Sequence, residues 1–89
     1  MKKDVSIDFD FKGVGHGNIS IFPDDDCQPF SLNAPGTRIF QMEQGNYLLR
    51  IEGVVSMEGG TVSVVNNETL IATLKLPEGY FSMPLSFTV

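Results

Sequence analysis

Residues 4–12 read Asp-Val-Ser-Ile-Asp-Phe-Asp-Phe-Lys, a stretch in which polar and apolar side chains alternate without exception. Successive side chains of a β-strand point to opposite faces, so this period of two is typical of a strand with one buried and one exposed face. The apolar face would consist of Val5, Ile7, Phe9 and Phe11. Residues 81–89 alternate in the same way. The chain is therefore predicted to begin and end in sheet.

Further strands are predicted between these ends, because short apolar runs recur about every ten residues between Gly, Pro and Asn turns. They cover residues 18–22, 37–42, 46–56, 62–65 and 69–76. The last run would also suit a short helix ended by Pro77, but Thr69 and Thr73 favour a strand. The sequence thus predicts an all-β fold: a single small antiparallel β-sandwich of jelly-roll or immunoglobulin-like type, with about seven strands, spanning residues 1–89.

Two glycine-containing segments are predicted to be hairpin turns. Gly13-Val-Gly-His-Gly17 follows the first strand, and residues 18–22 would pair back onto that strand. Glu58-Gly-Gly-Thr61 has the composition of a two-residue hairpin loop between residues 54–55 and 62–65. The spacing of the first segment is superficially that of a phosphate-binding loop, but no helix start follows it, so a turn is favoured.

The polar face of the first strand carries Asp4, Asp8 and Asp10. Charged side chains protect the edge of a sheet from pairing with another sheet, so the interpretation favoured here is a guarded edge strand. Paired carboxylates for glycoside hydrolysis are the alternative.

Composition and charge exclude several classes of partner. The 89 residues carry a formal net charge of −5, and their six Lys and Arg residues are scattered along the chain. Nucleic-acid binding depends on clustered basic residues, so neither nucleic acid nor an anionic membrane is an expected partner, and no membrane insertion is expected. Met1-Lys2-Lys3 is not followed by the apolar run of a signal peptide, and the ending at Val89 inside a strand pattern favours a domain cut from a longer protein. The compartment and the oligomeric state stay open.

Few residues have the spacing of a catalytic or metal site. Cys27 is the only cysteine, and the three aspartates before it disfavour its thiolate, so a nucleophile–base pair with His16 is not expected. Asp24, Asp25 and Asp26 offer oxygen ligands for Ca²⁺ but lack the alternating pattern of a calcium loop, which favours a solvated acidic turn. No catalytic residue, metal or cofactor is predicted, and the chain is not expected to be an enzyme.

A binding site is expected on the longest irregular stretch, residues 23–36, because binding residues concentrate on loops held by a rigid scaffold. This loop would lie near the turn at residues 77–81 and bring its aromatic ring, Phe30, beside Tyr80. Core packing is the alternative for both rings. The candidate binding residues are Phe30, Tyr80, Phe81, Asp24, Asp25 and Asp26. Such a site would suit an uncharged or cationic partner better than an anionic one.

The second half of the chain resembles a group of known modules. The run Gly45-Asn-Tyr-Leu-Leu-Arg-Ile-Glu52, the segment Glu-Gly-Gly-Thr-Val-Ser-Val-Val and the segment Leu-Pro-Glu-Gly-Tyr-Phe are similar to the latter half of many accessory β-sandwich modules. Carbohydrate-binding modules with a jelly-roll fold are one example. The resemblance covers about half of the chain and implies a fold rather than a ligand.

The expected function is that of a non-enzymatic β-sandwich module that binds a protein or a carbohydrate through loops or a sheet face. The alternative is a structural or assembly subunit. Such a subunit would oligomerise through an exposed strand, or through outward-facing residues of the predicted strand 46–56, namely Leu48 and Val54.

Overall fold

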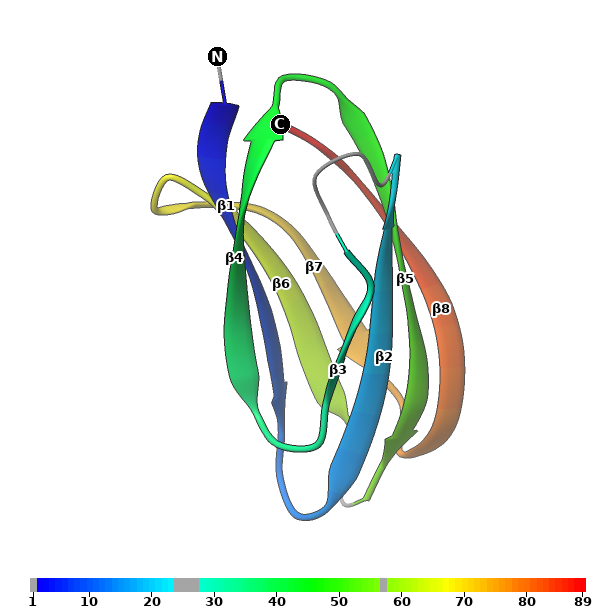
Figure 1. Cartoon of the computed structure of the whole chain (residues 1–89). Coiled ribbons are helices and arrows are strands. Elements are labelled where there is room, and N and C mark those ends of the chain that lie inside the picture. The colour runs from blue at the N-terminus through cyan, green and yellow to red at the C-terminus, as the bar shows by residue number, and fades with distance from the viewer. Residues whose placement is uncertain (1, 24–27, 57) are drawn as a thin grey trace.

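The computed structural model describes residues 2–23, 28–56 and 58–89, and these residues form two four-stranded antiparallel sheets without any helix. The strands are β1 (Lys2–Phe11), β2 (Gly15–Phe22), β3 (Phe30–Leu32), β4 (Gly36–Glu43), β5 (Asn46–Val55), β6 (Gly60–Asn66), β7 (Thr69–Leu76) and β8 (Gly79–Thr88). One sheet has the order β4-β1-β6-β7 and the other β3-β2-β5-β8 (Figure 1). The predicted all-β antiparallel sandwich is confirmed, including a strand rather than a helix at residues 69–76. The additional strand is β3, which has three residues and lies inside the predicted loop.

The predicted hairpin between the first two strands is wrong. β1 pairs with β4 and β6, whereas β2 pairs with β3 and β5 in the other sheet, so the chain crosses between the sheets after β1. The predicted hairpin at Glu58-Gly-Gly-Thr61 is wrong for the same reason, since β5 and β6 also lie in different sheets. Turn composition marks where a strand ends, but it does not say to which sheet the chain proceeds. The turn after Asn66 does form a hairpin, with positive φ at Asn67 (49°) and Glu68 (69°).

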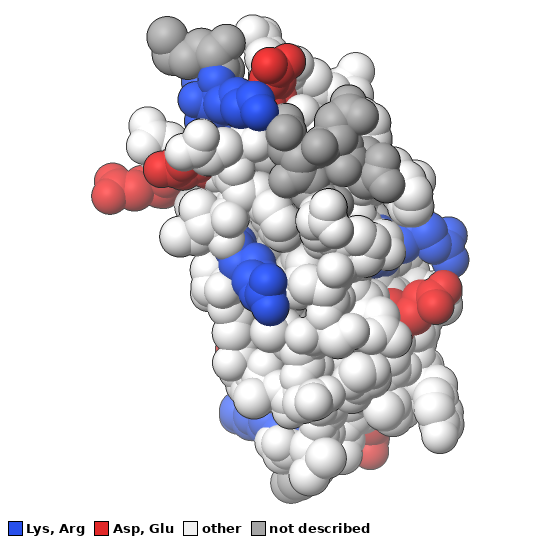
Figure 2. Space-filling model, in the orientation of Figure 1, with Lys and Arg blue, Asp and Glu red and all other residues white. Residues whose placement is uncertain are grey.

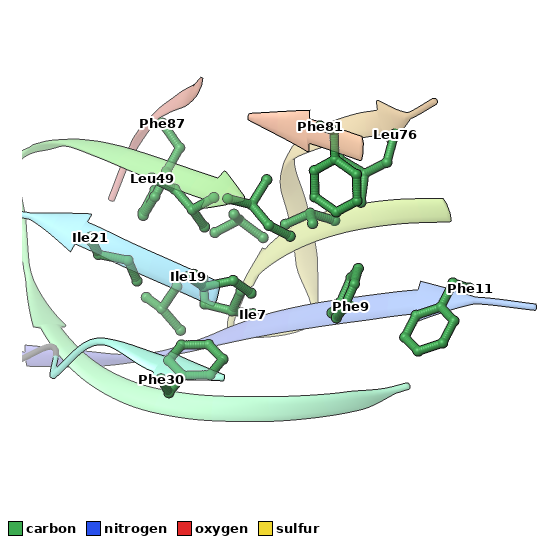
Figure 3. Packing of buried hydrophobic residues seen from close by; sticks show 14 of the residues in the cluster. Ile7, Phe9, Phe11, Ile19, Ile21, Phe30, Leu49, Leu76, Phe81 and Phe87 are labelled. Atoms are coloured by element: carbon green, nitrogen blue, oxygen red, sulfur yellow. The ribbon is translucent and has the colours of Figure 1, made fainter. Parts of the chain in front are cut away.

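Glycines in β2 make room for two phenylalanines of β1. A Cβ atom added to Gly17 would lie 2.8 Å from the ring of Phe9, and one added to Gly15 would lie 2.7 Å from the ring of Phe11. The two rings are themselves 4.9 Å apart, centroid to centroid, and they project side by side from β1 (Figure 3). Two residues of the predicted glycine turn are therefore inward-facing strand residues that let the two sheets approach each other.

β1 is a central strand, so the interpretation of its aspartates as guards of a sheet edge is wrong. It has β4 on one side and β6 on the other. Alternation shows that one face of a strand is exposed, but it carries no information about the neighbours beside the strand. Asp8 instead takes part in a cross-strand contact, accepting a hydrogen bond from the hydroxyl of Thr37 in β4.

The four edge strands each carry a feature that disfavours pairing with a further strand. β3 is very short. Arg38 of β4 is the register partner of buried Ile7, and its guanidinium lies 5.1 Å from the ring centroid of Phe30, at the seam between the sheets. A register irregularity at Val64/Val65 disturbs the pairing of β6 with β7, and Pro84 interrupts the free edge of β8. Short edges, inward-pointing charges, bulges and prolines are the devices by which natural sheets avoid edge-to-edge association.

The core lies between the sheets, and the sixteen buried hydrophobic residues in the described part of the chain form one cluster. In β5 the inward-facing residues Leu49, Ile51 and Val55 are completely buried, whereas Leu48, which is predicted to face outward, is exposed. Just after β8, Val89 exchanges two backbone hydrogen bonds with Gly45, which extends the pairing of β5 with β8 to the end of the molecule where β1 begins (Figure 1). No helix in the described part of the chain is long and apolar enough to cross a membrane.

Truncation on the two faces of β1 should have very different effects. Replacing Phe9, which is 1% exposed, by Ala should lower the free energy of unfolding by about 3–5 kcal/mol. Asp8→Asn should change it by no more than about 0.5 kcal/mol, because the new amide oxygen can still accept the hydrogen bond from Thr37. Denaturant midpoints measure both effects. Similar losses at the two positions would contradict the register of this strand.

Filling the space at Gly17 should also destabilise the fold. Gly17→Ala places a methyl group against the ring of Phe9, and such overpacking typically lowers the free energy of unfolding by about 1–3 kcal/mol. Gly45→Ala is the matched control, since its Cβ would have no neighbour closer than 3.9 Å. Combining Gly17→Ala with Phe9→Leu should cost less than the sum of the two single changes. Strict additivity in thermal or chemical unfolding would rule out this steric coupling.

Candidate functional site

The structure separates the residues of the predicted binding site. Phe30 is buried, with its ring centroid 5.6 Å from that of Phe40, and Phe81 is buried as well, in the same hydrophobic cluster (Figure 3). Tyr80 is 88% exposed. Asp24, Asp25 and Asp26 lie outside the described residues, as does Cys27.

The expected juxtaposition of Phe30 and Tyr80 is wrong. β3 and β8 are the two opposite edges of their sheet, with β2 and β5 between them. Along the strands, Phe30 is at the level of Ile19, whereas Tyr80 is at the level of His16 near the start of β2. The alternative prediction for Phe30, that its ring packs in the core, is confirmed, because Phe30 is an inward-facing residue of the short strand β3.

Tyr80 belongs to a row of side chains on the outer face of the β3-β2-β5-β8 sheet. His16 of β2 is directly opposite Val54 of β5, which is directly opposite Tyr80 of β8. Val14, two residues before His16, points to the same side and is 80% exposed. Cross-strand neighbours have Cβ atoms about 5 Å apart, so these side chains form one continuous surface. We call the surface formed by Val14, His16, Val54 and Tyr80 the Tyr80 corner.

The backbone beneath the Tyr80 corner is tightly held. Val14 and Ser56 are joined by three hydrogen bonds: from Ser56 N to Val14 O (2.8 Å), from Val14 N to Ser56 Oγ (3.0 Å) and from Ser56 Oγ to Val14 O (2.9 Å). A Cβ atom added to Gly53 would lie 2.0 Å from the carbonyl oxygen of His16. Only a glycine at this position allows β2 and β5 to come so close, and the outer row is fixed as a result.

His16 supplies the polar group of the corner. Its Nδ1 lies 2.6 Å from Oδ1 of Asn33. The amide oxygen is an acceptor only, so Nδ1 carries the hydrogen in this arrangement and Nε2 of the neutral ring is an acceptor. Asn33 is part of the predicted loop, so the end of that loop does reach the level of Tyr80, although Phe30 does not.

The middle of the same sheet face is polar and internally hydrogen-bonded. Arg50 donates to Ser82 (3.0 Å), and Ser82 donates to Glu52 (3.3 Å). This network separates the Tyr80 corner from a second apolar pair at the far end of the face, Phe22 and Leu48, which are opposite each other in the register. The Tyr80 corner is therefore a bounded patch rather than part of a wholly apolar face.

The corner combines apolar and polar side chains. It combines a fully presented aromatic ring with two aliphatic side chains and one hydrogen-bonding ring. Within the described ranges, no group of three or more His, Cys, Asp and Glu residues could hold a metal ion. Sequence reasoning placed His16 at the tip of a turn and did not consider Val14. Continuing the alternation of residues 18–22 backwards through the glycines would have placed both residues on the outer face.

The charged residues of the face seen in Figure 2 are dispersed. The Lys and Arg side chains on that face lie apart from one another and form no continuous basic surface.

Comparisons with known proteins provide no relative for this chain. No family model matches it, and the searches of curated proteins and of solved structures found no significant match.

Proposed function

We propose that the chain is a non-enzymatic β-sandwich module that binds a partner protein through the Tyr80 corner. The observation that carries the proposal is the exposure of Tyr80, of which 88% is open to solvent although it lies on a strand paired with β5. Tyr is enriched among the residues that contribute most to protein interfaces, because it presents a large area with little loss of side-chain entropy.

The neighbours of Tyr80 favour a protein over a glycan. Val54 is the register partner of Tyr80, and Val14 lies further along the same surface, two residues before His16. Aliphatic side chains add apolar contact area without adding the hydrogen bonds that a sugar requires. His16 provides a single polar contact at the side of the patch. A protein surface with one apolar side chain and a hydrogen-bond donor would match this arrangement.

The edges of the sheets argue against the alternative of a subunit that assembles through an exposed strand. Each edge strand carries a feature that disfavours strand addition: the shortness of β3, Arg38 in β4, the irregularity beside β7 and Pro84 in β8. Contact through the face of a sheet is therefore favoured over the addition of a strand to its edge.

Replacing Tyr80 by Ser should abolish partner binding without affecting the fold. With the protein immobilised as bait, a partner protein captured by the wild type should bind the variant at least about tenfold more weakly, which corresponds to about 1.4 kcal/mol. Phe22→Ser is the matched control, because Phe22 is 48% exposed at the far end of the same sheet face. Thermal unfolding midpoints of all three proteins should agree closely.

Three outcomes would contradict this proposal. Equal capture by wild type and Tyr80→Ser would exclude the corner as the binding surface. Binding on a glycan array that disappears with Tyr80→Ser would replace the protein partner by a carbohydrate. A stable oligomer at tens of micromolar in sedimentation, dissociated by Leu48→Ser, would support an assembly subunit instead.

A further inference from the structure

The outer face of the β4-β1-β6-β7 sheet carries a second apolar surface. Ile39 of β4, Ser6 of β1, Val65 of β6 and Leu70 of β7 are successive register partners and form one row across all four strands. Ile39 is 65% exposed and Leu70 is 58% exposed. We call this row the Ile39 band. It lies on the opposite side of the sandwich from the Tyr80 corner.

Carboxylates flank the Ile39 band on both sides. Asp4 and Asp8 are two residues before and after Ser6 on β1, so each lies about 7 Å from the row along the strand and points to the same face. Neither forms an ion pair with another described residue; the ion pairs in the described part of the chain join Lys12 to Glu58 and Arg50 to Glu52. The band is thus a mostly apolar strip, with Ser6 between its aliphatic residues and a carboxylate on each border; Lys2 lies two residues before Asp4 on the same face.

The carboxylates beside the Ile39 band favour some binding partners over others. A second copy docked face to face would bring Asp4 and Asp8 toward the same residues of its partner, and like charges close together oppose association. An anionic membrane surface would be repelled in the same way. A cationic polypeptide with an apolar stripe would be attracted, since its charges would meet the carboxylates while its apolar side chains covered Ile39 and Leu70.

We propose that the Ile39 band docks a basic amphipathic helix of a partner protein, lying across the strands. Four strands spaced about 4.8 Å apart make the band about 14 Å long, which matches about nine or ten residues of helix at 1.5 Å per residue. Lys or Arg residues on both sides of the apolar stripe then reach Asp4 on one border and Asp8 on the other. Because this surface is separate from the Tyr80 corner, the module could hold two partners at once.

The test is a nuclear magnetic resonance titration of the isotope-labelled protein with two synthetic helical peptides of about 14 residues, which share one leucine stripe. One peptide has lysines on both sides of the stripe and the other has glutamates. The lysine peptide should shift the amide signals of Ser6, Ile39, Val65 and Leu70, whereas the glutamate peptide should not.

Leu70→Ser and Asp4→Asn should each weaken the binding of the lysine peptide by about fivefold or more. Glu78→Gln, which removes the same charge at the turn before β8, should leave binding unchanged.

Several results would overturn this proposal. They are the absence of binding at millimolar peptide, equal binding of the two peptides, or signal shifts confined to other surfaces such as the Tyr80 corner. An equal effect of Asp4→Asn and Glu78→Gln would show that only the overall charge matters, and would overturn it as well. Ile39→Ser serves as a second variant if Leu70→Ser lowers the unfolding midpoint. None of these results depends on Tyr80, so the proposed function can fail or hold independently.

Discussion

The contact between the phenylalanines of β1 and the glycines of β2 sets the spacing of the two sheets. Phe9 and Phe11 fill space that side chains at Gly17 and Gly15 would otherwise occupy. Burial of two aromatic rings is a large stabilising contribution for a chain of this length, whose total stability is expected to be about 4–13 kcal/mol. The glycines weaken β2 as an isolated strand, but this cost is offset by the rings that they admit.

The same close packing positions the surface proposed to bind a partner. Gly53 is the register partner of Gly17, and it allows β5 to lie against the backbone of His16. Val54 and the other outward-facing side chains near Gly53 therefore project from the paired strands β2 and β5. The inner face of these strands is covered at this position by the ring of Phe9. The Tyr80 corner therefore owes its rigidity to core residues with which it makes no direct contact.

Much of the fold could be predicted from the sequence, because period-two alternation reports directly which residues of a strand are buried. It identified the inner faces of β1, β5 and β8. What it could not supply was the identity of neighbouring strands: the crossings after β1 and β5 depend on long-range packing, and turn residues such as Gly13 and Gly59 are compatible with either a hairpin or a crossing. The candidate site was predicted less well. Tyr80 is exposed as the proposed role requires, but Phe30 belongs to a three-residue strand too short to be distinguished from a loop.

The pairing of Val89 with Gly45 has a geometric consequence. β1 begins and β8 finishes at the same end of the sandwich (Figure 1), whereas Tyr80 lies nine residues before Val89, about 30 Å away along an extended strand. A linker attached at either terminus would therefore join the molecule at the end opposite the Tyr80 corner, which would form the distal tip. The long axis of the sandwich would act as a rigid spacer, which presents that tip to a partner and keeps the attachment point clear of it.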